Sequence, residues 1–149
     1  MSFAKPSLKG RALRLLSGRE YSRAELARKL QSFEEVPGTL SVALDDLQAK
    51  GFISEARVIE SVIHRRASKL GLMRIRHELQ AKGLDPESVA QALGGLKASE
   101  RARAQEVWRK KFGAAPSDAQ DAVKQMRFLA SRGFGGDVIR QVVKGAPDD

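Results

Sequence analysis

Apolar residues recur every three or four positions along most of the chain, and this spacing is typical of amphipathic helices. Polar capping signals mark where helices begin: Ser22 stands three residues before Glu25, and Asp85 directly precedes Pro86. Further capping signals stand at Ser54, Ser99 and Ser117. Together the periodicity and the caps predict helices over 9–18, 22–33, 39–50, 54–70, 71–82, 86–93, 99–112, 118–132 and 136–144.

A short pattern that begins with Leu and ends on a basic residue, Gly and an apolar residue occurs three times, at 47–52, 79–84 and 129–134. A glycine between a basic and an apolar residue is typical of a left-handed helix C-cap. The three expected cap residues are Gly51, Gly83 and Gly133. We interpret the copies as one helix–glycine–helix corner that is used three times.

This repeat predicts three tandem three-helix units, at 9–53, 54–96 and 97–145. A unit of that length buries little apolar surface by itself, so neighbouring units are expected to share buried surface. Repeats that contact mainly their neighbours give an elongated, curved, modular molecule.

The composition favours an all-α fold. The chain has 20 Ala and 16 Leu residues, one Thr, one Tyr and no Asn. Helix formers therefore dominate, whereas strands favour β-branched and aromatic residues. The five prolines stand where helices are expected to begin or to have ended, so none interrupts a periodic segment.

The charge is strongly positive and uneven. Lys and Arg number 27 against 18 acidic residues, which gives a net charge of +9 and a pI of about 10.3. Basic residues concentrate in 1–30, 61–84 and 97–111, whereas 31–60 has a net charge of −4. Such a surface attracts polyanions or an acidic partner protein.

Several kinds of chemistry have no support in the sequence. The chain contains no Cys, so disulfides and thiolate zinc sites are excluded. His64 and His77 lack metal-ligand spacing, and no glycine-rich phosphate loop occurs. No apolar segment is long enough to span a membrane, and the N-terminus has no export signal. We therefore expect a cytoplasmic protein that is not an enzyme and that holds no metal or cofactor.

Helical-wheel analysis separates a buried stripe from outer residues in the predicted helix 71–82. Leu72, Ile75 and Leu79 form the expected stripe. The residues expected outside it or at its edge are Arg74, Arg76, His77, Glu78 and Lys82. Arg66, in the preceding helix, lies within an apolar arc. Either its stem covers apolar surface, or an acid meets its guanidinium group.

In the predicted helix 118–132 the expected buried face is Ala122, Val123, Met126, Leu129 and Ala130. Lys124, Phe128 and Arg132 lie one turn apart on the other side. Phe128 either packs under a helix of its own unit or, between its two cations, stacks on a base or a partner side chain. Trp108, in the helix before, is expected to anchor core packing.

Three segments in order resemble the signatures of the RecX family, whose members regulate the bacterial RecA recombinase. They are Tyr21 to Leu30; Gly71-Leu72 with Arg74-Ile75-Arg76, Glu78-Leu79 and Lys82-Gly83; and Arg127-Phe128-Leu129 with Arg132-Gly133-Phe134. Lys110-Lys111-Phe112 also fits, and the resemblance covers about 10–144. The chain departs from the family at 54–59, where Arg57 is retained but the usual aromatic residue after it is replaced by Val58.

The resemblance implies a modular protein of three three-helix units that needs no cofactor. It implies binding to the filament of RecA on single-stranded DNA, in the groove or at the end. It further implies inhibition of strand exchange, of ATP hydrolysis and of the co-protease activity behind the SOS response. We expect the chain to be monomeric and to contact single-stranded DNA without sequence preference.

We expect the partner-binding surface on basic residues of the second and third units. The candidates are Arg65, Lys69, Arg74, Arg76, Lys82, Lys124, Arg127, Phe128 and Arg132. An alternative is a winged-helix-like transcriptional regulator that uses 21–53 as a helix–turn–helix. The second helix of that segment begins Thr39-Leu40-Ser41-Val42, without the residues that read base edges. A purely structural scaffold is a third possibility, which the net charge of +9 makes less attractive.

Overall fold

The structure is a computed structural model that describes residues 5–145. This part of the chain forms α-helices and one short 3-10 helix, Gln31–Phe33, and contains no strand. The α-helices are α1 (Leu8–Leu16), α2 (Arg23–Leu30), α3 (Thr39–Ala49), α4 (Glu55–Arg66), α5 (Leu72–Ala81), α6 (Pro86–Lys97), α7 (Glu100–Lys111), α8 (Ala119–Ser131) and α9 (Gly136–Val143). The predicted all-α fold is confirmed.

The helix starts follow the predicted capping signals closely. Ser22 and Glu25 form a capping box, in which Glu25 N donates to Ser22 Oγ (3.1 Å) and Ser22 N donates to Glu25 Oε1 (2.9 Å). The Asp85 carboxylate accepts from Ser88 N (3.0 Å), and Pro86 occupies the first helical position. These caps satisfy N–H groups that have no partner within the helix.

Some helix limits differ from the prediction. Helix α8 is capped by Asp118 rather than by Ser117, and the Ser99 side chain makes no capping hydrogen bond to α7. Helix α4 ends at Arg66, and the chain turns before α5, whereas α6 continues through both of its glycines to Lys97. Glycine weakens a helix by only about 1 kcal/mol, so packing of the surrounding turns can override it.

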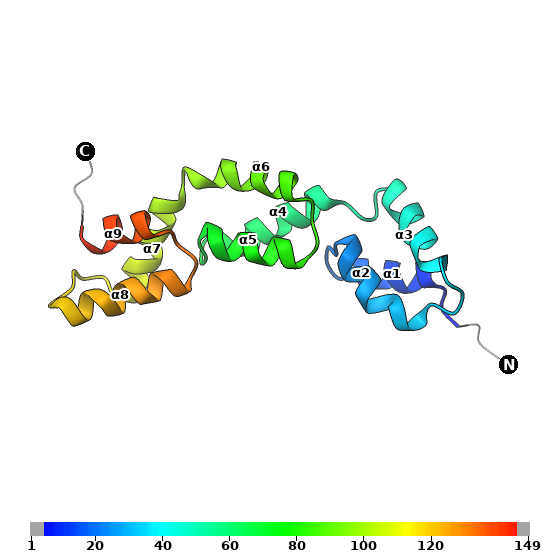
Figure 1. Cartoon of the computed structure of the whole chain (residues 1–149), viewed down its shortest axis with the longest axis horizontal. Helices are drawn as coiled ribbons and strands as arrows, with labels where there is room; N and C mark the ends of the chain where they lie inside the picture. Colours follow the sequence, from blue (N-terminus) through cyan, green and yellow to red (C-terminus); the bar gives the residue numbers. More distant parts are fainter. Residues whose placement is uncertain (1–4, 146–149) are drawn as a thin grey trace.

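Each group of three consecutive helices surrounds its own buried cluster. Residues that are almost fully buried are Leu26, Leu44 and Leu47 in α1–α3; Ile75, Leu79 and Leu93 in α4–α6; and Leu129, Phe134 and Val143 in α7–α9. We call these groups the first, second and third units, and we retain 9–53, 54–96 and 97–145 as their proposed limits. The units follow one another along the long axis of a curved, elongated molecule, with α1 and α9 at opposite ends (Figure 1).

The three expected corner glycines all have left-handed backbone, with φ of 83° at Gly51, 69° at Gly83 and 90° at Gly133. Their places in the units are not equivalent, however. Gly83 and Gly133 end the second helix of a unit, whereas Gly51 follows α3 and leads into the next unit. All three glycines therefore form the predicted helix–glycine–helix corner, but the first joins two units, whereas the other two lie within a unit. The pattern marks a C-cap, which is a local property, and so it does not indicate which helix it ends.

Candidate interaction surface

The second helices of the three units, α2, α5 and α8, lie end to end along the lower edge of the molecule in Figure 1. At each of two junctions, the C-terminal end of the later helix contacts the N-terminal end of the earlier one. Carbonyl groups at the C-terminal end of the later helix therefore accept from donors at the N-terminal end of the earlier helix. The dipoles of the two helices point in the same direction.

The first junction, between α5 and α2, is made through side chains. Ser22 Oγ donates to the carbonyl oxygen of Lys82 (2.6 Å), and Arg28 Nη2 donates to that of Ala81 (3.2 Å). Lys82 Nζ also donates to Glu25 Oε2 (3.2 Å), and these two side chains are only 14% and 12% exposed. The junction therefore contains a largely buried ion pair.

The environment of Glu25 shifts its titration. Partial burial raises the pKa of Glu25, but hydrogen bonds from the Ser22 backbone, Arg19 and Lys82 outweigh burial and hold the pKa below its usual value. The carboxylate is therefore charged at neutral pH and is stabilised by its neighbours at this junction.

The second junction, between α8 and α5, is made mainly through the backbone. Gly71 N donates to the carbonyl oxygen of Arg132 (2.8 Å), and Met73 N donates to that of Gly133 (3.1 Å). Arg74 Nη1 donates to the Ser131 carbonyl oxygen (2.6 Å). A Cβ atom on Gly71 would lie 2.4 Å from the carbonyl carbon of Gly133, so this close approach requires glycine.

Two charged residues of α7 support the second junction. Arg103 Nη1 donates to the carbonyl oxygens of Ala67 (2.8 Å) and Leu70 (2.9 Å), and the Glu100 carboxylate accepts from Leu72 N (3.1 Å). Burial lowers the pKa of Arg103 although nearby Glu100 acts to raise it. The sequence analysis missed both residues. The available signal was their three-residue spacing on the face of α7 that also holds buried Ala104.

Two of the expected partner-binding residues lie at these junctions. Lys82, expected at the edge of the stripe and facing outward, is largely buried against the first unit, so that expectation is wrong. Arg74 is exposed, but its guanidinium group bonds the third unit. A helical wheel describes the sides of a helix and says nothing about what meets its ends.

Other candidates face solvent. Lys69, Arg76, Lys124 and Arg127 are exposed, and none of them forms an ion pair with an acid in the described part of the chain. Arg65 is 47% exposed and lies 4.0 Å from Glu78. We call Lys29, Arg76, Lys124 and Arg127 the cationic row, because they are exposed cations on α2, α5 and α8, which lie in line.

Phe128 and Arg132 belong to a small aromatic cluster of the third unit. The Phe128 ring lies edge-on to Phe112, with ring centroids 5.5 Å apart. The Arg132 guanidinium carbon lies 4.9 Å from the Phe128 centroid, and Lys111 Nζ lies 5.4 Å from it. Phe128 therefore packs within its own unit, which is the first of the two open interpretations. The cations near its ring are Lys111 and Arg132.

The predicted buried face of α8 is partly wrong. Val123 is 48% exposed and Ala130 is exposed, whereas Gln125 is almost fully buried beside Leu129. Gln125 Oε1 accepts from Trp108 Nε1 (2.7 Å), and this hydrogen bond makes a buried amide acceptable. Trp108 itself packs against the core of the third unit, as expected.

The open question about Arg66 is resolved by an acid. Arg66 Nε donates to Glu78 Oε1 (3.0 Å), so the second interpretation holds. Glu78 was expected to point away from the unit, but its side chain is 25% exposed and faces α4. The wheel misplaced it because an opposite charge on a neighbouring helix attracts it inward.

The described residues include neither a metal-ligating cluster nor a membrane-spanning helix. In the part of the chain that the structure describes, no group of three His, Cys, Asp or Glu side chains is placed to hold a metal ion. No helix within 5–145 is long and apolar enough to cross a membrane. Exposed cations occur on each of the three helices that lie in line, and positive charge attracts polyanions.

Comparison with known proteins bears on all three units. Family models for the first, second and third three-helix domains of RecX match residues 9–36, 54–93 and 99–143. Two solved structures share the fold. RecX from Lactobacillus salivarius matches with a TM-score of 0.72 at 22% identity, covering 93% of each chain. A second regulatory protein RecX matches with a TM-score of 0.77 at 18% identity, covering 93% of this chain and 71% of that one.

Sequence relatives are more similar. The regulatory protein RecX of Leptothrix cholodnii is 54% identical over 138 residues, which cover 93% of this chain and 88% of the relative. That of Herminiimonas arsenicoxydans is 46% identical over 143 residues, covering 96% and 95%. With three domain models matched in order and relatives aligned over nearly their whole length, the chain belongs to the RecX family of regulatory proteins.

Proposed function

We propose that this protein binds the filament of RecA on single-stranded DNA and inhibits its recombinase, ATPase and co-protease activities. Family membership supports a regulatory role. The observation that carries the molecular proposal is the end-to-end line of α2, α5 and α8 with exposed cations on each helix. A curved array of this kind can follow a periodic filament, because each unit meets a successive part of it.

The candidate residues divide into two roles. Lys69, Arg76, Lys124 and Arg127 are exposed and available for direct contact. Arg65 lies near Glu78, and Arg132 lies over Phe128, so these three residues are only partly available. Arg74 and Lys82 act as positioning residues, because each bonds an adjacent unit. Binding then depends both on the charges and on the geometry that spaces them.

We further propose that the protein contacts single-stranded DNA without sequence preference and works as a cytoplasmic monomer without a cofactor. Each phosphate contact releases counterions, so affinity for DNA should fall steeply as salt is raised. The winged-helix alternative gains no support. The described chain has no strand to form a wing, and Arg23, in the segment that it uses, is bonded to Asp45 (2.7 Å).

The test is inhibition of RecA ATPase on single-stranded DNA by a variant with Arg76, Lys124 and Arg127 changed to Ala. Single exposed charges contribute about 1 kcal/mol or less, but their joint removal should weaken inhibition at least about tenfold. A matched variant with Lys97, Lys110 and Lys144 changed to Ala loses the same charge elsewhere and should inhibit like the parent. Equal inhibition by the parent and by the first variant, with its fold intact, would contradict the proposal.

A further inference from the structure

At the N-terminal tip of the molecule, the C-terminal end of α2 has no preceding unit on which to dock. The C-terminal ends of α5 and α8 each dock on the preceding unit, whereas α2 continues into the 3-10 helix Gln31–Phe33, which faces outward. Apolar side chains remain exposed there, with Phe33 44% and Val36 61% accessible. The equivalent surfaces of the other units are covered, so this end is an unpartnered docking surface.

A hollow of about 300 Å³ opens between α1 and this end of α2. Leu15 and Phe33 contribute apolar surface above the almost fully buried Leu30, and Arg11, Arg14 and Lys29 contribute three cations. No acid lines it, and none of these cations is ion-paired to a carboxylate within residues 5–145. We call this hollow, defined by these six residues, the tip pocket.

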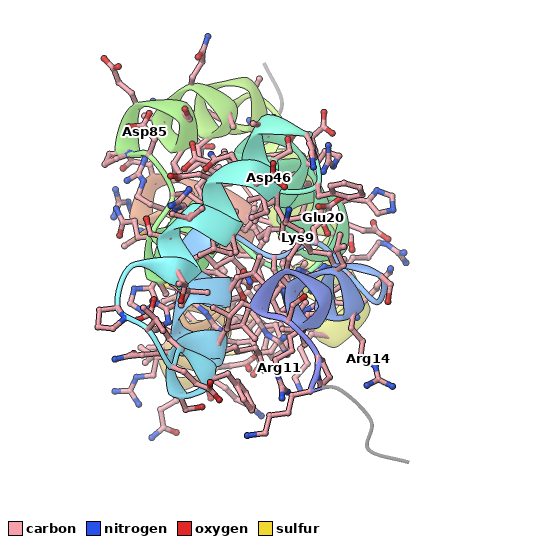
Figure 2. All side chains as sticks on the ribbon, turned by 90° about the vertical axis from the view of Figure 1, so that its right-hand side faces the viewer. Lys9, Arg11, Arg14, Glu20, Asp46 and Asp85 are labelled. Atoms are coloured by element: carbon pink, nitrogen blue, oxygen red, sulfur yellow. The ribbon has the colours of Figure 1, made fainter. Side chains whose placement is uncertain are left out.

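Figure 2 looks onto this end of the molecule. Arg11 and Arg14 lie together on the lower side of α1, whereas Lys9 points to the upper side, where its Nζ meets Asp46 Oδ2 (2.5 Å). Helix α1 thus has one face whose charge is neutralised within the first unit and one face whose charges are left without an acid. Unneutralised charge beside exposed apolar surface indicates a site for a partner of opposite charge.

We propose that the tip pocket binds an acidic segment of a partner protein through one large apolar anchor side chain. The anchor would cover Leu15 and Phe33, and flanking carboxylates would pair with Arg11, Arg14 and Lys29. Burial of apolar surface supplies affinity, whereas the ring of cations selects acidic neighbours of the anchor. This site goes beyond the proposed inhibition of RecA and does not depend on it.

The first junction offers an internal precedent. There the end of α5, the helix equivalent to α2, docks on a surface that supplies the acid Glu25 to the cation Lys82. An acidic partner at the free end of α2 would repeat that pairing in trans. The C-terminal ends of α5 and α2 would then both bind carboxylates, the first from Glu25 and the second from the partner.

A peptide fits the tip pocket better than a nucleic acid strand does. Proteins that bind single strands present free aromatic faces on which bases stack. Here the Arg11 guanidinium carbon already lies 3.8 Å from the centre of the Phe33 ring and covers one face. The space beside the ring is a compact hollow between α1 and α2, which suits one side chain.

The experiment measures binding of a fluorescein-labelled peptide in which Asp and Glu residues flank one central Phe. We expect the full-length protein to bind it. A double variant, Arg14→Glu with Lys29→Glu, should weaken binding at least about tenfold, since it replaces two attractions by repulsions. Phe33→Ala should weaken binding with the charge unchanged. Lys97→Glu with Lys144→Glu changes the net charge equally, far from the pocket, and should leave binding within about twofold.

The controls separate the alternatives. A peptide with Ala in place of Phe should bind several-fold more weakly, because the anchor is lost; equal binding would overturn the proposal. Equal losses in the two charge-reversed variants would also overturn it, since only net charge would then matter. So would an oligo-dT strand that competes for the pocket more strongly than the peptide. Sedimentation of the protein alone tests a second copy as occupant. Self-association that Phe33→Ala abolishes would assign the pocket to the chain itself.

Discussion

The two junctions between units share one architecture and differ in chemistry. In both, a basic C-cap residue ends the later helix, and its carbonyl oxygen accepts a hydrogen bond from the N-cap residue of the earlier helix. Three residues after that N-cap, α2 has Glu25 whereas α5 has Arg74. Lys82 therefore finds an acid at the first junction, whereas no acid stands at the equivalent position of the second, and Arg132 lies over Phe128.

The same three-helix repeat therefore forms junctions that differ in the interactions that hold them. The ion pair of Lys82 and Glu25 depends on the charge of Glu25, so it can weaken as pH falls, and its long side chains can re-form it at slightly different angles. The backbone hydrogen bonds from Gly71 N to Arg132 and from Met73 N to Gly133 depend on the close approach of Gly71 and Gly133. This contact tolerates neither a side chain nor much displacement, because the atoms are already at closest approach. We therefore infer that the first junction is adjustable and that the second is rigid.

The largest effect is expected at the glycine contact. In Gly71→Ala the new Cβ would meet the Gly133 backbone at 2.4 Å, although φ of −84° at position 71 suits alanine. Losing the docked hydrogen bonds should reduce the free energy of unfolding by about 3 kcal/mol and increase the radius of gyration. Urea denaturation and small-angle scattering measure the two quantities.

Gly94→Ala is the matched control for that substitution. A Cβ at Gly94, within α6, would meet nothing within 4 Å, so alanine should stabilise the helix by up to about 1 kcal/mol. If both substitutions had the same small effect, the second junction would not depend on the glycine contact.

Features of the fold were predictable from the sequence where they depend on residues that are close together in the chain. Helix starts at Ser22 and Asp85 and the left-handed Gly83 and Gly133 were predictable, because capping involves residues a few positions apart. The role of Gly71 was not, because its partner Gly133 lies 62 residues later in the sequence numbering. The one local hint was that Gly71 stands where α2 has the capping residue Ser22.

The candidate surface shows the same division. Exposure of Arg74 and Lys124 followed from periodicity, because both lie outside the expected buried faces of their helices. Burial of Gln125 did not, because it requires the hydrogen bond from Trp108, which belongs to another helix. The burial of Lys82 similarly requires an acid from another unit. A helical wheel counts only apolar positions, so it does not predict a buried polar residue whose hydrogen-bond or ion-pair partner lies far away in the sequence.

A smaller effect is expected from the ion pair of the first junction. Lys82→Met leaves Glu25 without its closest partner across the junction and should cost about 1–2 kcal/mol in unfolding free energy. Arg132→Met, at the equivalent place in the second junction, should cost less, because Arg132 makes no ion pair with an acid in 5–145. Urea denaturation of both variants measures the two losses of unfolding free energy. A larger loss for Arg132→Met would contradict the inference that the charged C-cap side chain matters more at the first junction.

Acid should weaken the first junction selectively. The pKa of Glu25 in the folded protein lies below its unfolded value of about 4.3, so its contribution is complete above that value and is lost as pH falls through the folded pKa. Amide exchange at α2 and α5 between neutral pH and pH of about 3 should therefore show the Ser22–Lys82 contact opening before the Gly71–Gly133 contact. In Glu25→Gln that acid-dependent step should disappear. Its persistence would assign the step to other carboxylates.

The smallest effect at neutral pH, and the sharpest test of the comparison, is expected from Arg74→Glu. This change gives α5 the acid that α2 has and places it near Arg132. It removes the hydrogen bond to Ser131 and offers an ion pair instead, so the net change in stability should be within about 0.5 kcal/mol. The second junction should gain the acid sensitivity of the first, since a carboxylate stabilised by Arg132 titrates at low pH. Arg76→Glu, at an exposed position of the same helix, makes the same charge change away from the junction. It should leave the acid response of the second junction as it is in the parent, where Glu100 already accepts from Leu72 N. Acid-dependent opening in both variants would mean that net charge, and not the position three residues after the N-cap, decides how a junction responds.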